Sequence, residues 1–354
     1  MPQVPTLQPV VARLLLPDDA NLSGNVHGGT ILQLMEQAGM IAATRYFNKP
    51  RPDQEETPEH QGQQYAGLAR IETMSFHQPV FVGEIASLST QILFTSGKSV
   101  LIKVTVSAEN ASTSTNRITN TGSLWYLSFV PQGKREPLKV VSIPQILPPQ
   151  DDERALKEYN QAKSLYEARK NDVNINTLPC LEIDGCLCPK CRLNFQPASP
   201  CKNRSESQQM LGQMVLPGDC GTSKIAFGGF VMKLMDTAAG CCAYRHARTN
   251  VVTVSISSMD FLSMIHLGDI VTLEAKLSFC SAKSMEIQVT AQVTSMTRQD
   301  HLVAKGIFSF VSLDEKNKLI PVPALKLETE QEFEEAFVSQ VKYETAKKQR
   351  LAKK

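Results

Sequence analysis

Apolar and polar positions follow two different periods along this chain, and the two patterns recur in the same order. In the stretches KSVLIKVTVS and KSMEIQVTAQV apolar residues occupy every second position, which is typical of β-strands with one buried face. Two segments, TILQLMEQAGMIAATRYF and FVMKLMDTAAGCCAYRHA, lack proline and are rich in Ala, Leu and Met, which favours helices. Because these helices are apolar nearly all round, we expect a sheet to enclose them.

Further strand-like runs surround the alternating stretches. Each half of the chain opens with an extended apolar stretch, VVARLLL or MLGQMVL. Two strand-like runs precede the alternating stretch in each half, and one follows it as SLWYLSFV or GIFSFVSL. Because the connections are short, the strands should pair mostly antiparallel. The pattern predicts an α+β fold, built twice, with an antiparallel sheet wrapped around a long central helix.

The two halves are copies of one another. Near the start of each copy, a constant offset in numbering aligns these pairs: Gly28-Gly29 with Gly228-Gly229, Leu34-Met35 with Leu234-Met235, and Arg45 with Arg245. Farther along, a smaller constant offset aligns Phe76 with Phe261, Gly83 with Gly268, and Lys98-Ser99 with Lys283-Ser284. The first copy is therefore the longer one, and we assign its surplus to the polar, proline-containing stretch FNKPRPDQEETPEHQGQQ as a surface loop. The predicted domains are 6–140 and 206–327.

The stretches outside the two copies lack the repeated pattern. The predicted linker, 141–205, contains a charged helical segment, DDERALKEYNQAKSLYEARK, and then an irregular segment rich in cysteine. The end of the chain, 328–354, is predicted to be a charged, solvated helical tail, with acids first and bases last as the helix dipole favours. A nuclear-targeting or anion-binding role for its basic end is the alternative.

Composition narrows the class of protein. A chain of 354 residues, 42% hydrophobic and 20% charged, suits roughly two soluble domains. A net charge of +2 provides no general attraction for nucleic acid or a membrane surface, so an anionic ligand would have to be bound locally. No export or transit signal is visible at the N-terminus, which favours the cytoplasm.

Nine cysteines, without a secretory signal, indicate reduced thiols rather than a disulfide framework. Five of them lie in the linker: Cys180, Cys186, Cys188, Cys191 and Cys201. They contain one C-x-x-C pair, whereas a structural zinc site usually has two such pairs at regular spacing. Reduced loop thiols are therefore favoured and no metal is assigned, with a zinc site as the alternative.

Each predicted helix carries one carboxylate at the same distance from its first glycine, Glu36 after Gly28 and Asp236 after Gly228. Burying a carboxylate costs several kcal/mol unless polar groups compensate, so an acid inside an apolar helix requires a reason. Catalysis is one reason. A structural pair with Lys or Arg, or a place at a domain interface, is the other.

The glycine pairs Gly28-Gly29 and Gly228-Gly229 begin these helices. Their backbone N–H groups would lie unpaired at the positive end of the helix dipole, where an oxygen that gains negative charge is stabilised. Glycine pairs also serve tight turns and close packing, so this signal is weak alone.

The copies differ just before the glycines, where the first has GNVH and the second KIAF. Asn25 can hydrogen-bond a water or a carbonyl oxygen, whereas its counterpart Ile225 cannot. This asymmetry suggests one working site with parts from both copies. His27 is better explained as a structural residue than as a proton carrier, because the second copy has Phe227 in its place.

The motifs GNVHGGTILQLMEQAG and FGGFVMKLMDTAAG, each followed by a TSGKS or CSAKS strand start, resemble the two hotdog domains of the cytosolic (brain-type) acyl-CoA hydrolase family. The resemblance covers both domains. It implies two tandem hotdog domains paired side by side, with Asn25 and Asp236 as the catalytic pair and with three chains in a trimer. Glu36 would then face Ile225 at a degenerate second site, and Phe227 departs from the His usual in the family.

The implied reaction is the hydrolysis of fatty acyl-CoA to fatty acid and CoA, without a metal or redox cofactor. Asp236 would activate water as a general base or attack the thioester itself, and Asn25 would orient the water or the carbonyl. Two other interpretations stay open. A hotdog hydratase would need an Asp and a His in one site, and no downstream His repeats here. A non-catalytic acyl-CoA sensor is the other.

CoA carries phosphates, and two equivalent strand starts offer lysines that could meet them. Lys98-Ser99 and Lys283-Ser284 are candidates for CoA binding. Solvated lysines at strand ends are the alternative.

Overall fold

The computed structural model describes residues 10–21, 24–49, 63–130, 139–168, 181, 186–188, 191, 198–221, 224–296 and 298–351. The chain divides into two compact units. The first contains Met1–Lys170, Phe227–Lys233 and Asp260–Leu262, and the second contains Asn171–Ala226, Leu234–Met259 and Ser263–Lys354. Two short pieces of the second copy, from α4 with its preceding residue and from the end of β9 with its following residue, therefore belong to the first unit. The predicted domain boundaries themselves stay a prediction.

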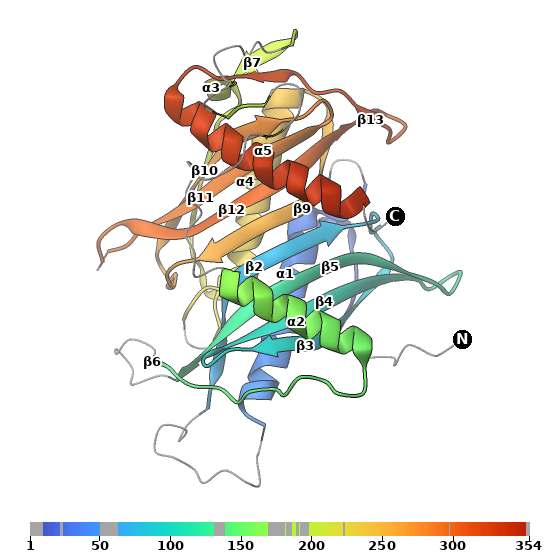
Figure 1. Ribbon diagram of the computed structural model, residues 1–354, viewed down its shortest axis with the longest axis vertical. Coiled ribbons are helices and arrows are strands. Elements are labelled where there is room, and N and C mark those ends of the chain that lie inside the picture. Colours follow the sequence, from blue (N-terminus) through green and yellow to red (C-terminus); the bar gives the residue numbers. More distant parts are fainter. Residues whose placement is uncertain are drawn as a thin grey trace. The chain divides into compact units, whose positions relative to one another are not determined.

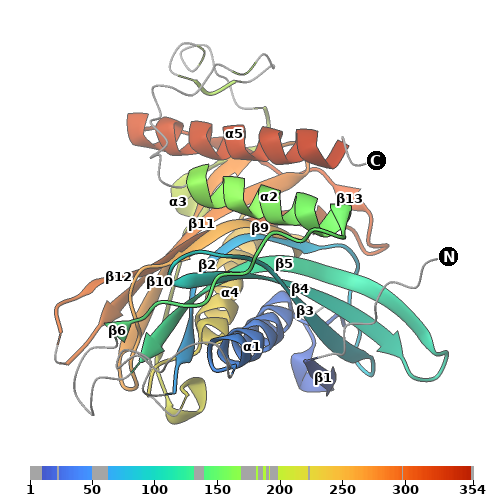
Figure 2. The same ribbon diagram turned by 60° about the horizontal axis from the view of Figure 1, so that its bottom comes forward.

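The first unit is an antiparallel sheet in the order β1-β3-β4-β5-β2, with one long helix on its inner face. Its elements are β1 (Val11–Leu14), α1 (Gly28–Phe47), β2 (Tyr65–Phe76), β3 (Ile85–Thr95), β4 (Ser99–Asn110), β5 (Thr115–Val130), β6 (Lys139–Val140) and α2 (Glu153–Ala168). Figure 2 shows α1 and α2 on opposite faces of this sheet. The alternating residues Val100, Ile102, Val104 and Val106 are fully buried, as the period of two predicts.

The second unit repeats this arrangement in the order β9-β12-β11-β10-β8. Its elements are β7 (Cys201–Asn203), α3 (Arg204–Ser207), β8 (Gln209–Met214), α4 (Gly228–Ala247), β9 (Asn250–Phe261), β10 (Ile270–Cys280), β11 (Ser284–Thr294), β12 (His301–Leu313), β13 (Leu319–Ile320), β14 (Ala324–Lys326) and α5 (Glu330–Leu351). β7 and β14 pair in parallel as a separate two-stranded sheet. The predicted α+β fold, a helix within an antiparallel sheet in each copy, is confirmed.

The change in alignment between the copies falls where the sequence predicts it. The helices α1 and α4 start at the aligned glycines Gly28 and Gly228. The next strands, β2 and β9, start at Tyr65 and Asn250, so the connection from helix to strand is much longer in the first copy. The extra residues therefore lie between Phe47 and Tyr65. Most of the predicted surface loop, 50–62, lies outside the described residues.

The predicted linker helix is α2, and it packs against the sheet of the first unit. Ala162 is buried in a cluster with Phe94, Leu101 and Trp125, on the face of the sheet that α1 does not cover. The rings of Tyr159 and Phe94 pack edge to face, with their centroids 5.4 Å apart. In Figure 1 the same helix lies across β3 and β4.

The predicted tail helix is α5, and the expectation that it is solvated is wrong. Ala336 and Phe337 are buried against Phe279 of β10, although the opposite face of the helix is charged. Phe279 corresponds to Phe94 in the first copy, so each sheet uses the same aromatic position to bind a helix that follows it in the chain. The charge of the segment concealed this, because apolar residues at helical spacing on one face are sufficient for docking. Among the described residues, no helix combines the length and apolarity that crossing a membrane requires.

Candidate active site

Glu36 lies in the interior of the first unit, in the middle of α1. Only 2% of its surface is exposed. The backbone N–H of Gly229, in the first turn of α4, is hydrogen-bonded to its carboxylate. Among the groups that the structure describes, none is within hydrogen-bond reach of its Oε2 atom. The acid thus depends on a backbone donor, and the described residues supply no Lys or Arg partner for it.

Burial raises the pKa of Glu36 to about 7, because the carboxylate loses water and the Gly229 N–H compensates only in part. An unfolded chain would release this proton near the ordinary pKa of 4.5. Between these values the folded protein holds a proton that the unfolded chain has lost, so the free energy of unfolding falls as pH rises through this window. The free-energy cost of holding ionised Glu36 in the interior is fully present above about pH 7 and absent below about pH 4.5.

The variant Glu36→Gln removes this titration while keeping an oxygen that can accept from Gly229. We expect it to raise the free energy of unfolding by at most about 3 kcal/mol at pH 8 and hardly at all at pH 4. Urea unfolding of both proteins at the two pH values measures the difference. An equal gain at both pH values would contradict the raised pKa.

The prediction of unpaired N–H groups at the helix starts is wrong for the second glycine of each pair. The N–H of Gly29 donates to Nδ1 of His27 at 3.0 Å, which makes His27 the N-cap of α1. This bond gives His27 a structural role, as the sequence favours. Phe227 cannot cap in this way, and the Gly229 N–H is bonded to Glu36 instead.

Both second glycines also permit the two helix starts to touch. A Cβ atom on Gly29 would lie 3.0 Å from Cα of Lys233, and one on Gly229 would lie 2.9 Å from Cα of Gln33. Backbones approach this closely only where a glycine lacks the side chain. Glu36 lies one helical turn after Gln33 and so on the same face of α1, which is why it reaches the Gly229 N–H.

Asp236 occupies the equivalent position on α4, within the second unit. Its surface is 2% exposed. Its Oδ1 atom accepts a hydrogen bond of 2.7 Å from Oγ1 of Thr253 on β9. Sequence reasoning missed Thr253. The sequence alignment could have revealed it. The offset that matches Phe76 with Phe261 also aligns Leu68 of the first copy with the polar Thr253 of the second.

Leu68 packs against the first residue of α4, Gly228, within the first unit. A Cβ atom on Gly228 would lie 2.7 Å from Cδ2 of Leu68. This apolar side chain cannot hydrogen-bond a carboxylate or a water, whereas Thr253 can. At this aligned position the first copy therefore lacks the hydroxyl donor that Asp236 receives from Thr253. Binding of a substrate oxygen by the N–H groups of Gly28 or Gly228 stays a prediction.

Asn25 lies in a short loop before α1, in the first unit. Its backbone N–H donates to Oδ1 of Asn21 at 3.2 Å, and its carbonyl accepts from the Asn21 N–H at 2.6 Å. Gly24 and its counterpart Lys224 both adopt left-handed backbone angles, with φ of 80° and 58°. Lys224 thus adopts the backbone conformation of Gly24, although left-handed angles are unfavourable for a lysine. The second copy differs in its side chains, since Ile225 replaces the amide of Asn25. Within the described part of the chain, no group bonds the Asn25 amide, so it can bind water or substrate.

The two Lys-Ser pairs form equivalent tight turns between strands. The hydroxyl of Ser99 is 2.6 Å from that of Ser96, and the hydroxyl of Ser284 is 2.7 Å from that of Ser281. The serines therefore hold the turns together. Both lysines, at 98 and 283, are exposed, and CoA binding by them stays a prediction.

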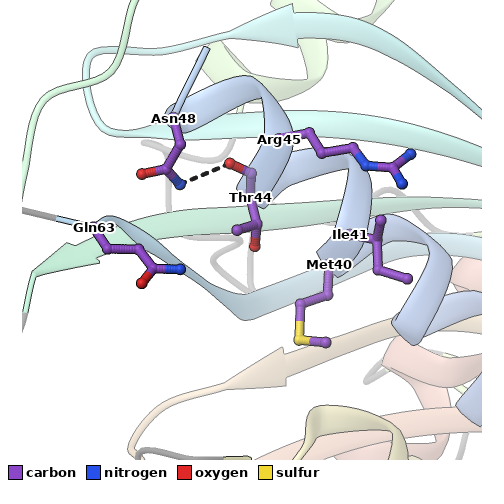
Figure 3. Close-up of a pocket in the computed structure, with 6 residues that line it drawn as sticks. All are labelled: Met40, Ile41, Thr44, Arg45, Asn48 and Gln63. Atoms are coloured by element: carbon purple, nitrogen blue, oxygen red, sulfur yellow. Dashed lines mark hydrogen bonds between the residues drawn. The ribbon is translucent and has the colours of Figure 1, made fainter. Parts of the chain in front are cut away.

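A shallow hollow of about 470 Å³ lies at the far end of α1 (Figure 3). Its walls are Met40, Ile41, Thr44, Arg45, Asn48 and Gln63. Asn48 closes the helix by donating to the carbonyl of Thr44 at 2.8 Å. Gly28 and Met40 are separated by roughly 18 Å along the helix axis, so this hollow is not part of the helix-start site.

The structure leaves both predicted pairings, Asn25 with Asp236 and Glu36 with Ile225, as predictions, because each joins residues of different units. Glu36 and the start of α4 meet within the first unit. Asn25 belongs to the first unit and Asp236 to the second, and their meeting stays a prediction. Ile225, the counterpart of Asn25, lies in the second unit.

The sequence matches the thioesterase superfamily in two segments, residues 23–114 and 223–297. It is 36% identical over 331 residues to the cytosolic acyl coenzyme A thioester hydrolase of Rattus norvegicus, with 92% of this chain and 80% of that protein covered. The human protein of the same name is 35% identical over 332 residues, with the same coverage. A putative oleoyl thioesterase from Lactobacillus plantarum has a similar fold, with a TM-score of 0.50, 9% identity, and 86% of this chain and 96% of that chain covered.

Proposed function

Because the chain belongs to the family of cytosolic acyl coenzyme A thioester hydrolases, we propose that it hydrolyses fatty acyl-CoA at one composite site per chain. In this site Asp236 of the second copy acts with Asn25 of the first. The product pair is a free fatty acid and CoA.

The contact between Glu36 and Gly229 supports this pairing. In the first unit, the carboxylate of one copy reaches the helix start of the other. The close approach of Gly29 to Lys233 matches that of Gly229 to Gln33, so the two copies meet as equivalents at their helix starts. If the two copies contribute equivalently, Asp236 of the second copy would reach the start of α1, which follows Asn25 in the chain. We infer that duplication created two such sites and that one of them kept its polar groups.

The proposed reaction begins with the thioester carbonyl near the start of α1, where the Gly28 N–H and the helix dipole favour an oxygen that gains negative charge. Asp236 takes a proton from water, the resulting hydroxide adds to the carbonyl carbon, and the carbon–sulfur bond breaks. The proton then passes to the departing thiolate of CoA. Asn25 orients the water or the carbonyl. Direct attack by Asp236, through an anhydride that water hydrolyses, uses the same groups.

Thr253 is a positioning residue in this scheme, because its hydroxyl donates to Asp236 Oδ1 at 2.7 Å. We expect Thr253→Val to lower kcat on the order of 10-fold, since a carboxylate without this bond is less well oriented. Losing a donor to the ionised form should also move the acid limb of the kcat/KM profile to higher pH.

The matched control is Thr253→Ser, which keeps the hydroxyl and should restore both rate and pH profile. A rate loss in Thr253→Val without any shift of the acid limb would assign Thr253 to packing alone. Steady-state kinetics from pH 5 to pH 9 distinguishes these results.

Release of CoA from a long-chain acyl-CoA, followed with a thiol reagent, tests the proposed function directly. Hydrolysis by the wild type that is lost in Asp236→Asn supports the composite site. A sensor would bind acyl-CoA without releasing thiol. A hydratase would remove the conjugated double bond of crotonyl-CoA without releasing thiol.

We also propose that the protein is cytoplasmic, because the names of its relatives call them cytosolic. We further propose that three chains assemble into a trimer, as the family resemblance implies. Each copy exposes apolar side chains at equivalent positions at the end of its edge strand and just after it, Leu14 and Leu16 in one and Met214 and Leu216 in the other. Repeated apolar exposure of this kind is typical of surfaces that another chain covers. Sedimentation of the purified protein as a monomer would contradict the trimer.

A further inference from the structure

Three cysteines of the second unit converge at one place that the thioesterase reaction does not use. The Sγ atoms of Cys186, Cys188 and Cys191 all lie within 4.8 Å of one another. None of the three is in a disulfide. Of the other linker cysteines, Cys180 lies outside the described residues and Cys201 is exposed at the start of β7. We propose that the three converging thiols bind a structural zinc ion.

The local backbone directs the three sulfurs to one point. Cys186 and Cys188 are two positions apart, so in extended chain they project to the same side. The N–H of Cys191 donates to the carbonyl of Cys188 at 3.0 Å, which holds the third cysteine close to the second. Three ligands would thus come from one short stretch of sequence.

The separation of the sulfurs suits a tetrahedral ion. Zinc binds thiolate sulfur at about 2.3 Å, which places neighbouring ligands of a tetrahedron roughly 3.8 Å apart. Small side-chain rotations would bring the observed sulfurs to that spacing. Thiolate ligands favour zinc over harder cations such as Mg²⁺ or Ca²⁺. The sequence favoured reduced thiols because it has a single C-x-x-C pair, and the convergence of Cys186 with that pair is the observation that favours a metal here.

The packing explains why an ion is useful here. Cys186 and Cys188 are only 4% and 3% exposed, yet the described residues around them form neither helix nor strand. The segment is held to α5 by the Leu187 N–H, which donates to Oε1 of Gln340 at 2.9 Å, and by contact with Phe337. Ordering such a segment costs conformational entropy. A zinc ion would crosslink it and so stabilise the docking of α5 on β10.

Plain burial of thiols is the competing explanation, because cysteine often behaves as a small apolar residue. Apolar packing alone does not require three sulfurs to meet. The zinc proposal is also independent of the thioesterase site, so it can fail while hydrolysis stands.

Metal analysis of the full-length protein, purified without chelator or affinity metal, tests the proposal. We expect roughly one zinc ion per chain, as a structural site requires. Replacement by Co²⁺ should give the charge-transfer and visible absorption bands of tetrahedral cobalt–thiolate coordination. Substoichiometric zinc together with absence of these bands would overturn the proposal, and this result needs no variant to fold.

Variants then assign the ligands. Cys186→Ser and Cys188→Ser should lose zinc and the cobalt bands, and chelation of the wild type should lower Tm. The matched control is Cys241→Ser, because Cys241 is exposed on α4 and lies outside the cluster. Zinc retained at full occupancy in both cluster variants, or a disulfide between Cys188 and Cys191 in the protein as purified, would also overturn the proposal.

Discussion

Asp236→Asn is expected to lower kcat for long-chain acyl-CoA on the order of 10³-fold, with little change in KM. An amide is nearly the same size as a carboxylate and can still accept the Thr253 hydrogen bond of 2.7 Å, so the fold should persist. It cannot take a proton from water or attack a carbonyl, and general-base assistance contributes about 10² to 10⁴ in rate. Because the loss falls on the transition state, kcat and kcat/KM should decrease together.

Glu36→Gln is the matched control, since Glu36 holds the equivalent position in the other copy. It should leave kcat within about 3-fold of the wild type, because Leu68 and Ile225 stand at the positions that Thr253 and Asn25 hold for the proposed working site. Circular dichroism and thermal unfolding will test whether both variants fold. If Glu36→Gln loses as much activity as Asp236→Asn, the one-site proposal is wrong.

Asn25→Ala carries the second-largest expected effect, a decrease in kcat of about 10² to 10³, comparable to the loss of one oriented donor in other hydrolases. The backbone of the loop is held by two bonds to Asn21, so removal of the amide should not unfold it. Single-turnover hydrolysis separates this effect from substrate binding, because the amide acts on the water or on the carbonyl as charge develops.

Ile225→Ala provides the corresponding truncation in the second copy. We expect it to change kcat less than about 3-fold, since Ile225 has no polar group to lose. Equal losses in the two variants would show that both loops serve catalysis or that both act only through stability. Unfolding curves of each variant decide between these outcomes.

Much of the fold was predictable because it depends on local periodicity and on the duplication. Strand β4 shows this, since its alternating valines and isoleucine are all fully buried. The helices α2 and α5 were harder to interpret. The overall charge of α5 suggested exposure. The repeat aligns Phe94 with Phe279, but only the structure shows that a helix packs on each of them.

The candidate site divides in the same way. Glu36 and Asp236 stand out in the sequence because a carboxylate in an apolar helix is rare and its position repeats. The partners of those acids did not stand out, because Gly229 and Thr253 are brought to them by other elements. The N–H of Gly29 was expected to be unpaired, and the side chain of His27 just before it proved to cap it.

By itself the sequence determined that the chain is a duplicated α+β protein with one buried acid in each copy and with an amide before only one helix. Those features depend on residue type, spacing and repetition, which remain visible without coordinates. Tertiary structure alone decided what surrounds each acid, which helices dock on the sheets, and that three linker cysteines converge. The contacts of the acids and of the docked helices join residues distant in the chain through packing and hydrogen bonds, and no local pattern encodes them.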